Sequence, residues 1–89
     1  MSPELRLPGD FPDHAWEVEA KGWFAAEVAL PGGGTRTVTF YDPVRLRQDV
    51  EADLDAGRPV SITRLIVVER VTADLMARAV ASLPGGFLR

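Results

Sequence analysis

Residues 38–68 constrain the fold more than any other part of the chain, because they are typical of a β-strand, a capped α-helix and a second β-strand in succession. Residues 35–41 are rich in β-branched and aromatic side chains, which favour a strand. Asp42 then provides a preferred N-cap, and Pro43 loses no hydrogen bond at the first helical position. We expect the helix to run to about Ala56, with Gly57 as its left-handed stop.

This helix is amphipathic. Its apolar stripe is formed by Val44, Leu46, Val50 and Leu54, most of them four residues apart. Arg45 is paired in sequence with Asp49, and Arg47 with Glu51, each at the i,i+4 spacing of neighbours on a helix surface. The pattern predicts that the stripe packs on a sheet while the charged residues face solvent.

A further strand is expected over residues 60–69, where the apolar run 65–68 suggests cover on both faces. Arg64 interrupts the alternation. A bulge near residues 63–64 would place Val60, Ile62, Leu65 and Val67 on one face. The alternative, an inward Arg64, would need a carboxylate partner, so the bulge is favoured. Thr72 then caps a last helix, and Phe87 and Leu88 are expected to fold back onto the core.

Residues 16–30 are open to two interpretations. Apolar residues occupy the even positions and charged residues many of the odd ones, which favours a long strand, bent at Gly22. A helix capped by Asp13 competes, because Trp16, Ala20, Phe24 and Val28 are also four residues apart, although Gly22 would destabilise it by about 1 kcal/mol. The glycine-rich residues 31–34 lead into a strand, so a hairpin is favoured.

The expected fold is therefore a single α+β domain of two layers, with element order ββαβα and two helices packed on one face of a three-stranded sheet. The chain has 89 residues, which suits one domain, assigned here to residues 14–89. Residues 1–13 contain three prolines and are expected to form an arm without regular structure. In the alternative, Leu5, Leu7 and Phe11 tie this arm onto the domain or onto a second subunit.

Composition excludes several classes of function. The net charge of −3 argues against nucleic-acid binding, which normally requires a basic surface. The absence of cysteine excludes disulfides, thiolate metal sites and a cysteine nucleophile. No apolar run is long enough for a transmembrane helix, and the first residues do not form a signal-peptide pattern, so a soluble cytoplasmic protein without cofactor is expected.

Few side chains suggest chemistry. His14 lies beside Asp13 and three residues before Glu17, but one histidine in such a group is a poor basis for a metal site, and none is predicted. The helix that begins after Asp42 carries carboxylates at i,i+4, which could hold a cation or transfer protons: Asp49 with Asp53, and Glu51 with Asp55. The interleaved arginines favour a solvated charged face instead.

A partner-binding surface is the strongest functional indication. If Phe24, Val28, Val38 and Phe40 meet the helices, then Trp23, Ala25, Ala29 and Tyr41 must face away from them, together with two aliphatic residues of 65–68. Apolar patches with aromatic residues tend to mark protein interfaces. The predicted partner-binding residues are Trp23, Ala25, Tyr41, Leu65 and Val67. In the alternative, the N-terminal arm or Phe87 and Leu88 cover this face.

Three functions are compatible with these observations. The favoured one is a non-catalytic protein-interaction module: a homodimer, an accessory subunit, or an inhibitor or immunity-type partner. The second is a small-molecule-binding or enzymatic domain that uses Tyr41, Asp42, Arg64 and His14. The third is a nucleic-acid-binding regulator, whose contacts would be made by Arg36, Arg45, Arg47 and Arg58.

Overall fold

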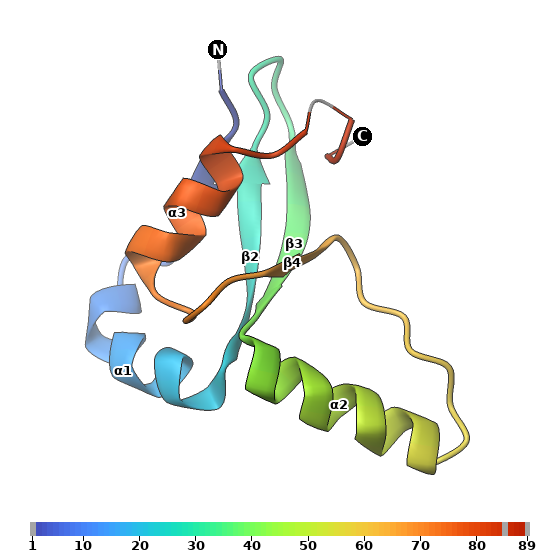
Figure 1. Ribbon diagram of the computed structural model, residues 1–89. Helices are drawn as coiled ribbons and strands as arrows, with labels where there is room; N and C mark the ends of the chain where they lie inside the picture. Colours follow the sequence, from blue (N-terminus) through green and yellow to red (C-terminus); the bar gives the residue numbers. More distant parts are fainter. Residues whose placement is uncertain (1, 85, 89) are drawn as a thin grey trace.

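The structure, a computed structural model, describes residues 2–84 and 86–88. These residues form a small α+β domain with one mixed sheet in the order β1-β2-β3-β4 (Figure 1). The elements in chain order are β1 (Glu4–Arg6), α1 (Phe11–Lys21), β2 (Trp23–Ala29), β3 (Thr35–Tyr41), α2 (Pro43–Asp55), β4 (Leu65–Val67) and α3 (Ala73–Ala81). The expected α+β class is correct, but the three-stranded sheet, the two helices and the order ββαβα are wrong in detail.

The single strand expected over residues 16–30 is a helix followed by a strand. Residues 16–21 belong to α1, and β2 begins at Trp23. Gly22 lies between them with φ of 78° and donates its N–H to the carbonyl of Val18, so it ends a helix instead of bending a strand. The helical interpretation is correct for residues 16–21, although α1 begins at Phe11 after Asp10 and is not capped by Asp13, and the strand interpretation is correct from Trp23 onward.

The N-terminal residues are more ordered than expected. β1 pairs antiparallel with β2, placing Leu5 opposite Val28, and α1 begins at Phe11. Pro3 and Pro8 flank β1 without interrupting it, which an edge strand tolerates. The alternative, in which apolar residues tie this segment down, is the correct one: Phe11 lies in the core and Leu5 packs against it.

The core lies between one face of the sheet and the helices α1 and α3. Its fully buried side chains come mainly from the two long strands and α3: Val28, Val38, Phe40, Val71, Met76 and Val80. Leu88 and Phe87 fold back onto this core, as expected. Among the described residues, no helix combines the length and apolar character required to span a bilayer.

Helix α2 starts as predicted but packs differently. The Asp42 carboxylate accepts a hydrogen bond of 2.7 Å from the N–H of Arg45, and Pro43 is the first helical residue. However, none of the residues of α2 is buried, and it projects from the sheet on the side away from α1 and α3 (Figure 1). The prediction that this helix covers the core is therefore wrong; α1 takes that place beside α3.

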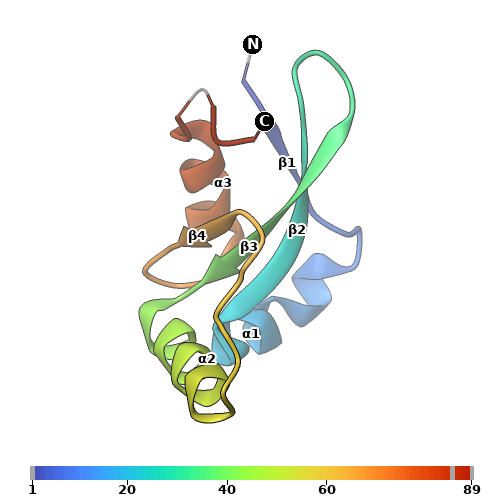
Figure 2. The same cartoon turned by 90° about the vertical axis from the view of Figure 1, so that its right-hand side faces the viewer.

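The strand expected over residues 60–69 is reduced to β4. Residues 56–64 instead run along the outside from the end of α2 back to the sheet (Figure 2). A turn at residues 63–64 replaces the expected bulge, and Arg64 has φ of 42° and donates to the carbonyl of Thr37 at 3.4 Å, not to a carboxylate. Ile66 is buried but Val67 is 48% exposed, so the run 65–68 is covered on one face only.

Candidate functional site

The sheet face turned away from the core gathers the apolar residues singled out in the sequence. Trp23 pairs with Tyr41 and Tyr41 with Val67, forming one row across three strands. Ala25 pairs through Thr39 with Leu65, forming the next row. Because directly paired residues project to the same side of a sheet, all five predicted partner-binding residues lie on one face. We call this set, Trp23, Ala25, Tyr41, Leu65 and Val67, the open sheet face.

Four of these five side chains are accessible to solvent. Trp23 is 37% exposed and Val67 48%, whereas Ala25 is exposed and Leu65 half-buried. Tyr41, at 8%, is buried, and its ring stacks against that of Trp23 with centroids 6.5 Å apart. Tyr41 therefore lies beside Trp23 in the row and contributes little to the exposed surface.

The two chain ends do not cover this face, although α2 and residues 61–63 lie over its central residues Thr39 and Tyr41. Leu5, Leu7 and Phe87 pack against the core, and Leu88 belongs to it. They therefore bind the opposite side of the sheet, the side that carries Val28 and Phe40. The open sheet face is left to solvent over its Trp23, Ala25 and Val67 side chains.

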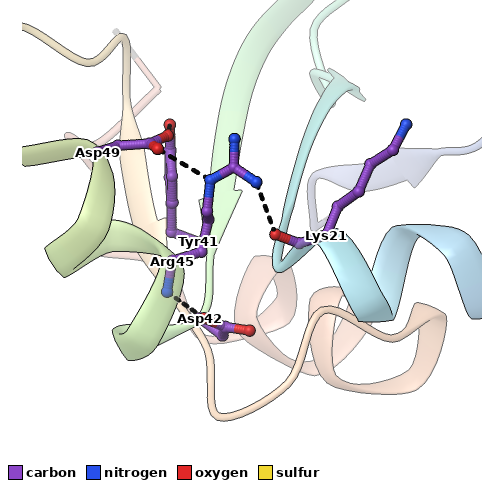
Figure 3. Close-up of polar contacts among 5 residues, drawn as sticks. All are labelled: Lys21, Tyr41, Asp42, Arg45 and Asp49. Atoms are coloured by element: carbon purple, nitrogen blue, oxygen red, sulfur yellow. Dashed lines mark hydrogen bonds and ion pairs between the residues drawn. The ribbon is translucent and has the colours of Figure 1, made fainter. Parts of the chain in front are cut away.

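A polar network fixes α2 at one end of this face (Figure 3). The Tyr41 hydroxyl donates to Oδ2 of Asp49 at 2.6 Å, and Nε of Arg45 donates to Oδ1 of the same carboxylate at 2.8 Å. Arg45 also donates to the carbonyl of Lys21, the last residue of α1, at 3.2 Å. The Asp42 N–H donates to the carbonyl of Gly22 at 2.8 Å. The start of α2 is thus bound to the junction of α1 and β2.

This network determines the protonation of its members. Burial, and then the hydrogen bond to Asp49, raise the pKa of the Tyr41 hydroxyl to about 12. The hydrogen bond from Tyr41, and then Arg45, hold the pKa of the Asp49 carboxyl below its usual value. At neutral pH Tyr41 is therefore a neutral donor and Asp49 an ionised acceptor. In these states the pair forms a charge-assisted hydrogen bond that joins α2 to β3.

A cavity of about 330 Å³ lies between α2, the sheet and residues 61–63. Its lining comprises Thr39, Tyr41, Asp49, Ala52, Asp53, Ser61, Ile62 and Thr63. The carboxylate pair Asp49 and Asp53, noted in the sequence, is thus directed at this cavity. Each carboxylate already has an arginine partner, since Arg58 lies 3.1 Å from Asp53 and Arg45 2.8 Å from Asp49.

The other residues considered for ligand binding do not gather there. Of Tyr41, Asp42, Arg64 and His14, only Tyr41 lines the cavity. Asp42 caps α2, and His14 lies on α1 with its imidazole 53% exposed and 3.5 Å from the carboxylate of Asp10. Within residues 2–84 and 86–88, no three histidine or acidic side chains converge as metal ligands.

The arginines considered for nucleic-acid binding are mostly held by carboxylates. Arg47 pairs with Glu51 at 3.0 Å, and Arg45 and Arg58 pair as described above. Arg36 donates to the neighbouring carbonyl of Thr35 at 2.9 Å. Such pairs weaken the positive field that phosphate binding requires.

Sequence reasoning missed two features of this region. The cavity-lining residues 61–63 were assigned to a strand, and the approach of α2 to Gly22 was not foreseen. An alanine Cβ at residue 22 would lie 2.5 Å from Oδ2 of Asp42. A glycine between a helical pattern and a strand pattern is a signal for such a junction, although it does not identify the neighbour.

Comparisons of this chain with protein-family models, with curated proteins and with solved structures found no match. The function is therefore argued from the geometry of the site itself.

Proposed function

We propose that this protein is a small non-catalytic interaction module that binds a protein partner through its open sheet face. The proposal rests on four apolar side chains that lie in adjacent rows of the sheet: Trp23, Ala25, Leu65 and Val67. The two ends of the chain pack against the core and do not cover these side chains. Aromatic and aliphatic side chains of this kind are enriched at the centres of protein interfaces.

The edge strands of the sheet present fewer binding groups to a partner than its open face does. Both edge strands, β1 and β4, contain three residues each, so few backbone groups are free to pair with an added strand. Glu27 and Arg6, paired across β2 and β1, provide a charged border to the apolar rows on the same face. An apolar centre with a polar rim is the usual anatomy of a protein contact.

The residues around Tyr41 also support a binding role over a catalytic one. With the pKa of Tyr41 raised and that of Asp49 lowered, Tyr41 stays protonated and Asp49 ionised at neutral pH. The ring of Tyr41 packs against the indole of Trp23, with centroids 6.5 Å apart, which restricts the orientations open to the indole. A rigid aromatic side chain loses little conformational entropy when a partner covers it, which favours its use as an anchor.

The chain offers a matched control for testing this proposal. Trp16 lies on α1 and is 69% exposed, so Trp16→Ser removes an exposed indole without touching the open sheet face. Affinity capture with immobilised wild-type protein, Trp23→Ser and Trp16→Ser from lysate of the source cells identifies partners, and binding is then measured with purified components. We expect Trp23→Ser to weaken the partner's affinity at least about tenfold, as for an aromatic hot spot, and Trp16→Ser to leave it unchanged.

The proposal would be wrong if the purified complex formed equally well with Trp23→Ser. It would also be wrong if the wild-type protein captured no partner and Trp23→Ser left its self-association unchanged. Circular dichroism of each variant verifies that the fold is retained.

The cavity supports a second candidate function, the binding of a small polar molecule. Its volume of about 330 Å³ is at the lower end of the range for ligand sites, and Asp49 and Asp53 with hydroxyl-bearing neighbours favour a cationic, hydrogen-bonding ligand. Titration with small amines such as putrescine and arginine, followed by two-dimensional NMR, tests it. Saturable shifts at Ser61 and Thr63 that Asp53→Asn abolishes would support this function, and unchanged spectra would exclude it for that ligand class.

A further inference from the structure

The apolar stripe of α2 is only partly covered by the described residues of the chain. Leu46, Val50 and Leu54 follow one another at four-residue spacing and so lie on one side of the helix. None of them belongs to the core or to the partly buried side chains packed against it. Leu54 is 59% exposed, and Leu46 and Val50 are half-buried. An amphipathic helix normally buries its stripe, because tertiary packing supplies most of its stability.

The charges of α2 are distributed against its own dipole. Acidic side chains stabilise the first turn of a helix and basic ones the last turn. Within α2, which is described throughout, the first turn has no acid and the last turn no base. Arg45 is accounted for, since it binds the C-terminal carbonyl of α1. Arg47 in the first half and Glu51 in the second half pair with each other at 3.0 Å, and they are 81% and 61% exposed.

An antiparallel second helix would satisfy both features at once. When two copies of α2 meet antiparallel about Val50, Leu46 of one copy faces Leu54 of the other, and the stripe covers itself. Arg47 and Glu51 lie on the same flank of the stripe, one turn apart. In this arrangement Arg47 of each copy approaches Glu51 of the second copy. A parallel two-fold arrangement would instead bring this flank against the opposite flank of the stripe, which carries Asp49 and Asp53 and lines the cavity.

We propose that the occupant of this stripe is a second copy of the chain, bound through antiparallel α2 helices. The pairing forms a closed two-fold contact, the commonest symmetry of homo-oligomers. It uses a different surface from the open sheet face, so it stands or falls independently of the proposed function. The helix of 13 residues is only about 20 Å long, so the interface is smaller than those of stable dimers and the expected dissociation constant is in the micromolar range.

Charge reversal tests the pairing directly by sedimentation velocity. Arg47→Glu and Glu51→Arg each place like charges opposite one another in their own homodimer. We expect each variant alone to dimerise at least about tenfold more weakly than the wild type. In the mixture, the Arg47→Glu variant carries acids at both positions, and the Glu51→Arg variant carries arginines at both. The two variants are therefore complementary in charge. A heterodimer should therefore form at wild-type affinity or better. Both residues are exposed, so the fold is expected to survive, and circular dichroism verifies it.

The matched control is Arg78→Glu. Arg78 is also an exposed arginine in an i,i+4 ion pair, with Asp74 of α3, and its reversal should leave dimerisation unchanged. The proposal is overturned if the wild-type protein stays monomeric at millimolar concentration. It is equally overturned if it dimerises but both reversals have no effect, or if the mixture forms no heterodimer.

Discussion

Replacing Gly22 by alanine tests how the start of α2 is attached to the rest of the domain. Gly22 has φ of 78°, a left-handed conformation that destabilises a non-glycine residue by about 1 kcal/mol. The added Cβ would also lie 2.5 Å from Oδ2 of Asp42 and 2.8 Å from Cβ of Arg45. These contacts are too short, and the first turn of α2 must shift to relieve them.

The shift disturbs two hydrogen bonds at this junction. One is the cap, from the Arg45 N–H to Asp42, and the other joins the Asp42 N–H to the carbonyl of Gly22. Loss of a cap destabilises by about 1 kcal/mol, and loss of a backbone hydrogen bond by about the same. Together with the backbone strain, Gly22→Ala should therefore lower the free energy of unfolding by about 3 kcal/mol.

Gly57 provides a matched control. It has nearly the same backbone conformation, with φ of 76°, but an added Cβ there would meet nothing within 4 Å. Gly57→Ala should therefore lower the free energy of unfolding by only about 1 kcal/mol. Urea denaturation followed by circular dichroism measures both variants. If the two lose the same stability within about 0.5 kcal/mol, close to the error of extrapolation, the close approach of α2 to Gly22 does not contribute as argued.

Further predictions concern the polar network and the core. Between about pH 10 and 12 the folded state keeps the Tyr41 proton that the unfolded state releases, so wild-type stability should fall by about 2–3 kcal/mol relative to Tyr41→Phe, in pH-dependent urea melts. Because the pKa of Asp49 is lowered in the folded state, the ionised carboxylate should raise the free energy of unfolding above about pH 4 and lose this effect at lower pH. Asp49→Asn should lack this pH dependence in the same urea melts. Asp42→Ala should cost about 1 kcal/mol through the lost cap, measured by urea melts. Phe40→Ala should cost about 3–5 kcal/mol in the same assay, since Phe40 is fully buried; a loss below about 1 kcal/mol would contradict its place in the core.

Local signals in the sequence were sufficient for some elements. The start of α2 was predictable because Asp42 and Pro43 act within one turn, through the cap and through the missing N–H. β3 was predictable because its β-branched and aromatic residues favour a strand and a glycine-rich loop precedes it.

Residues 16–30 show where such signals end. Their apolar residues fit period two and period four equally, and tertiary contacts choose between them. Leu5 of β1 lies opposite Val28 of β2 in the sheet. Phe11, at the start of α1, packs edge-on against Phe24 of β2 with ring centroids 5.3 Å apart, and this contact holds α1 against the sheet. Neither contact can be read from residues 16–30 alone.

The sequence also predicted the placement of α2 and of the open sheet face only in part. The stripe of Leu46, Val50 and Leu54 predicts a buried face, but it does not state against which surface, and within this chain α2 leaves the core to α1. The five residues of the open sheet face could be grouped from alternation along each strand. Their arrangement in two rows required the register of β4, which the long expected strand did not supply.

The central claim is that a protein partner covers the open sheet face, and the fluorescence of Trp23 tests it most directly. In a Trp16→Phe variant, Trp23 is the sole tryptophan, and it is 37% exposed in the free protein. We predict that addition of a saturating amount of the partner shifts its emission to shorter wavelength and markedly lowers acrylamide quenching. A complex in which Trp23 remains as accessible to acrylamide as in the free protein would contradict the account.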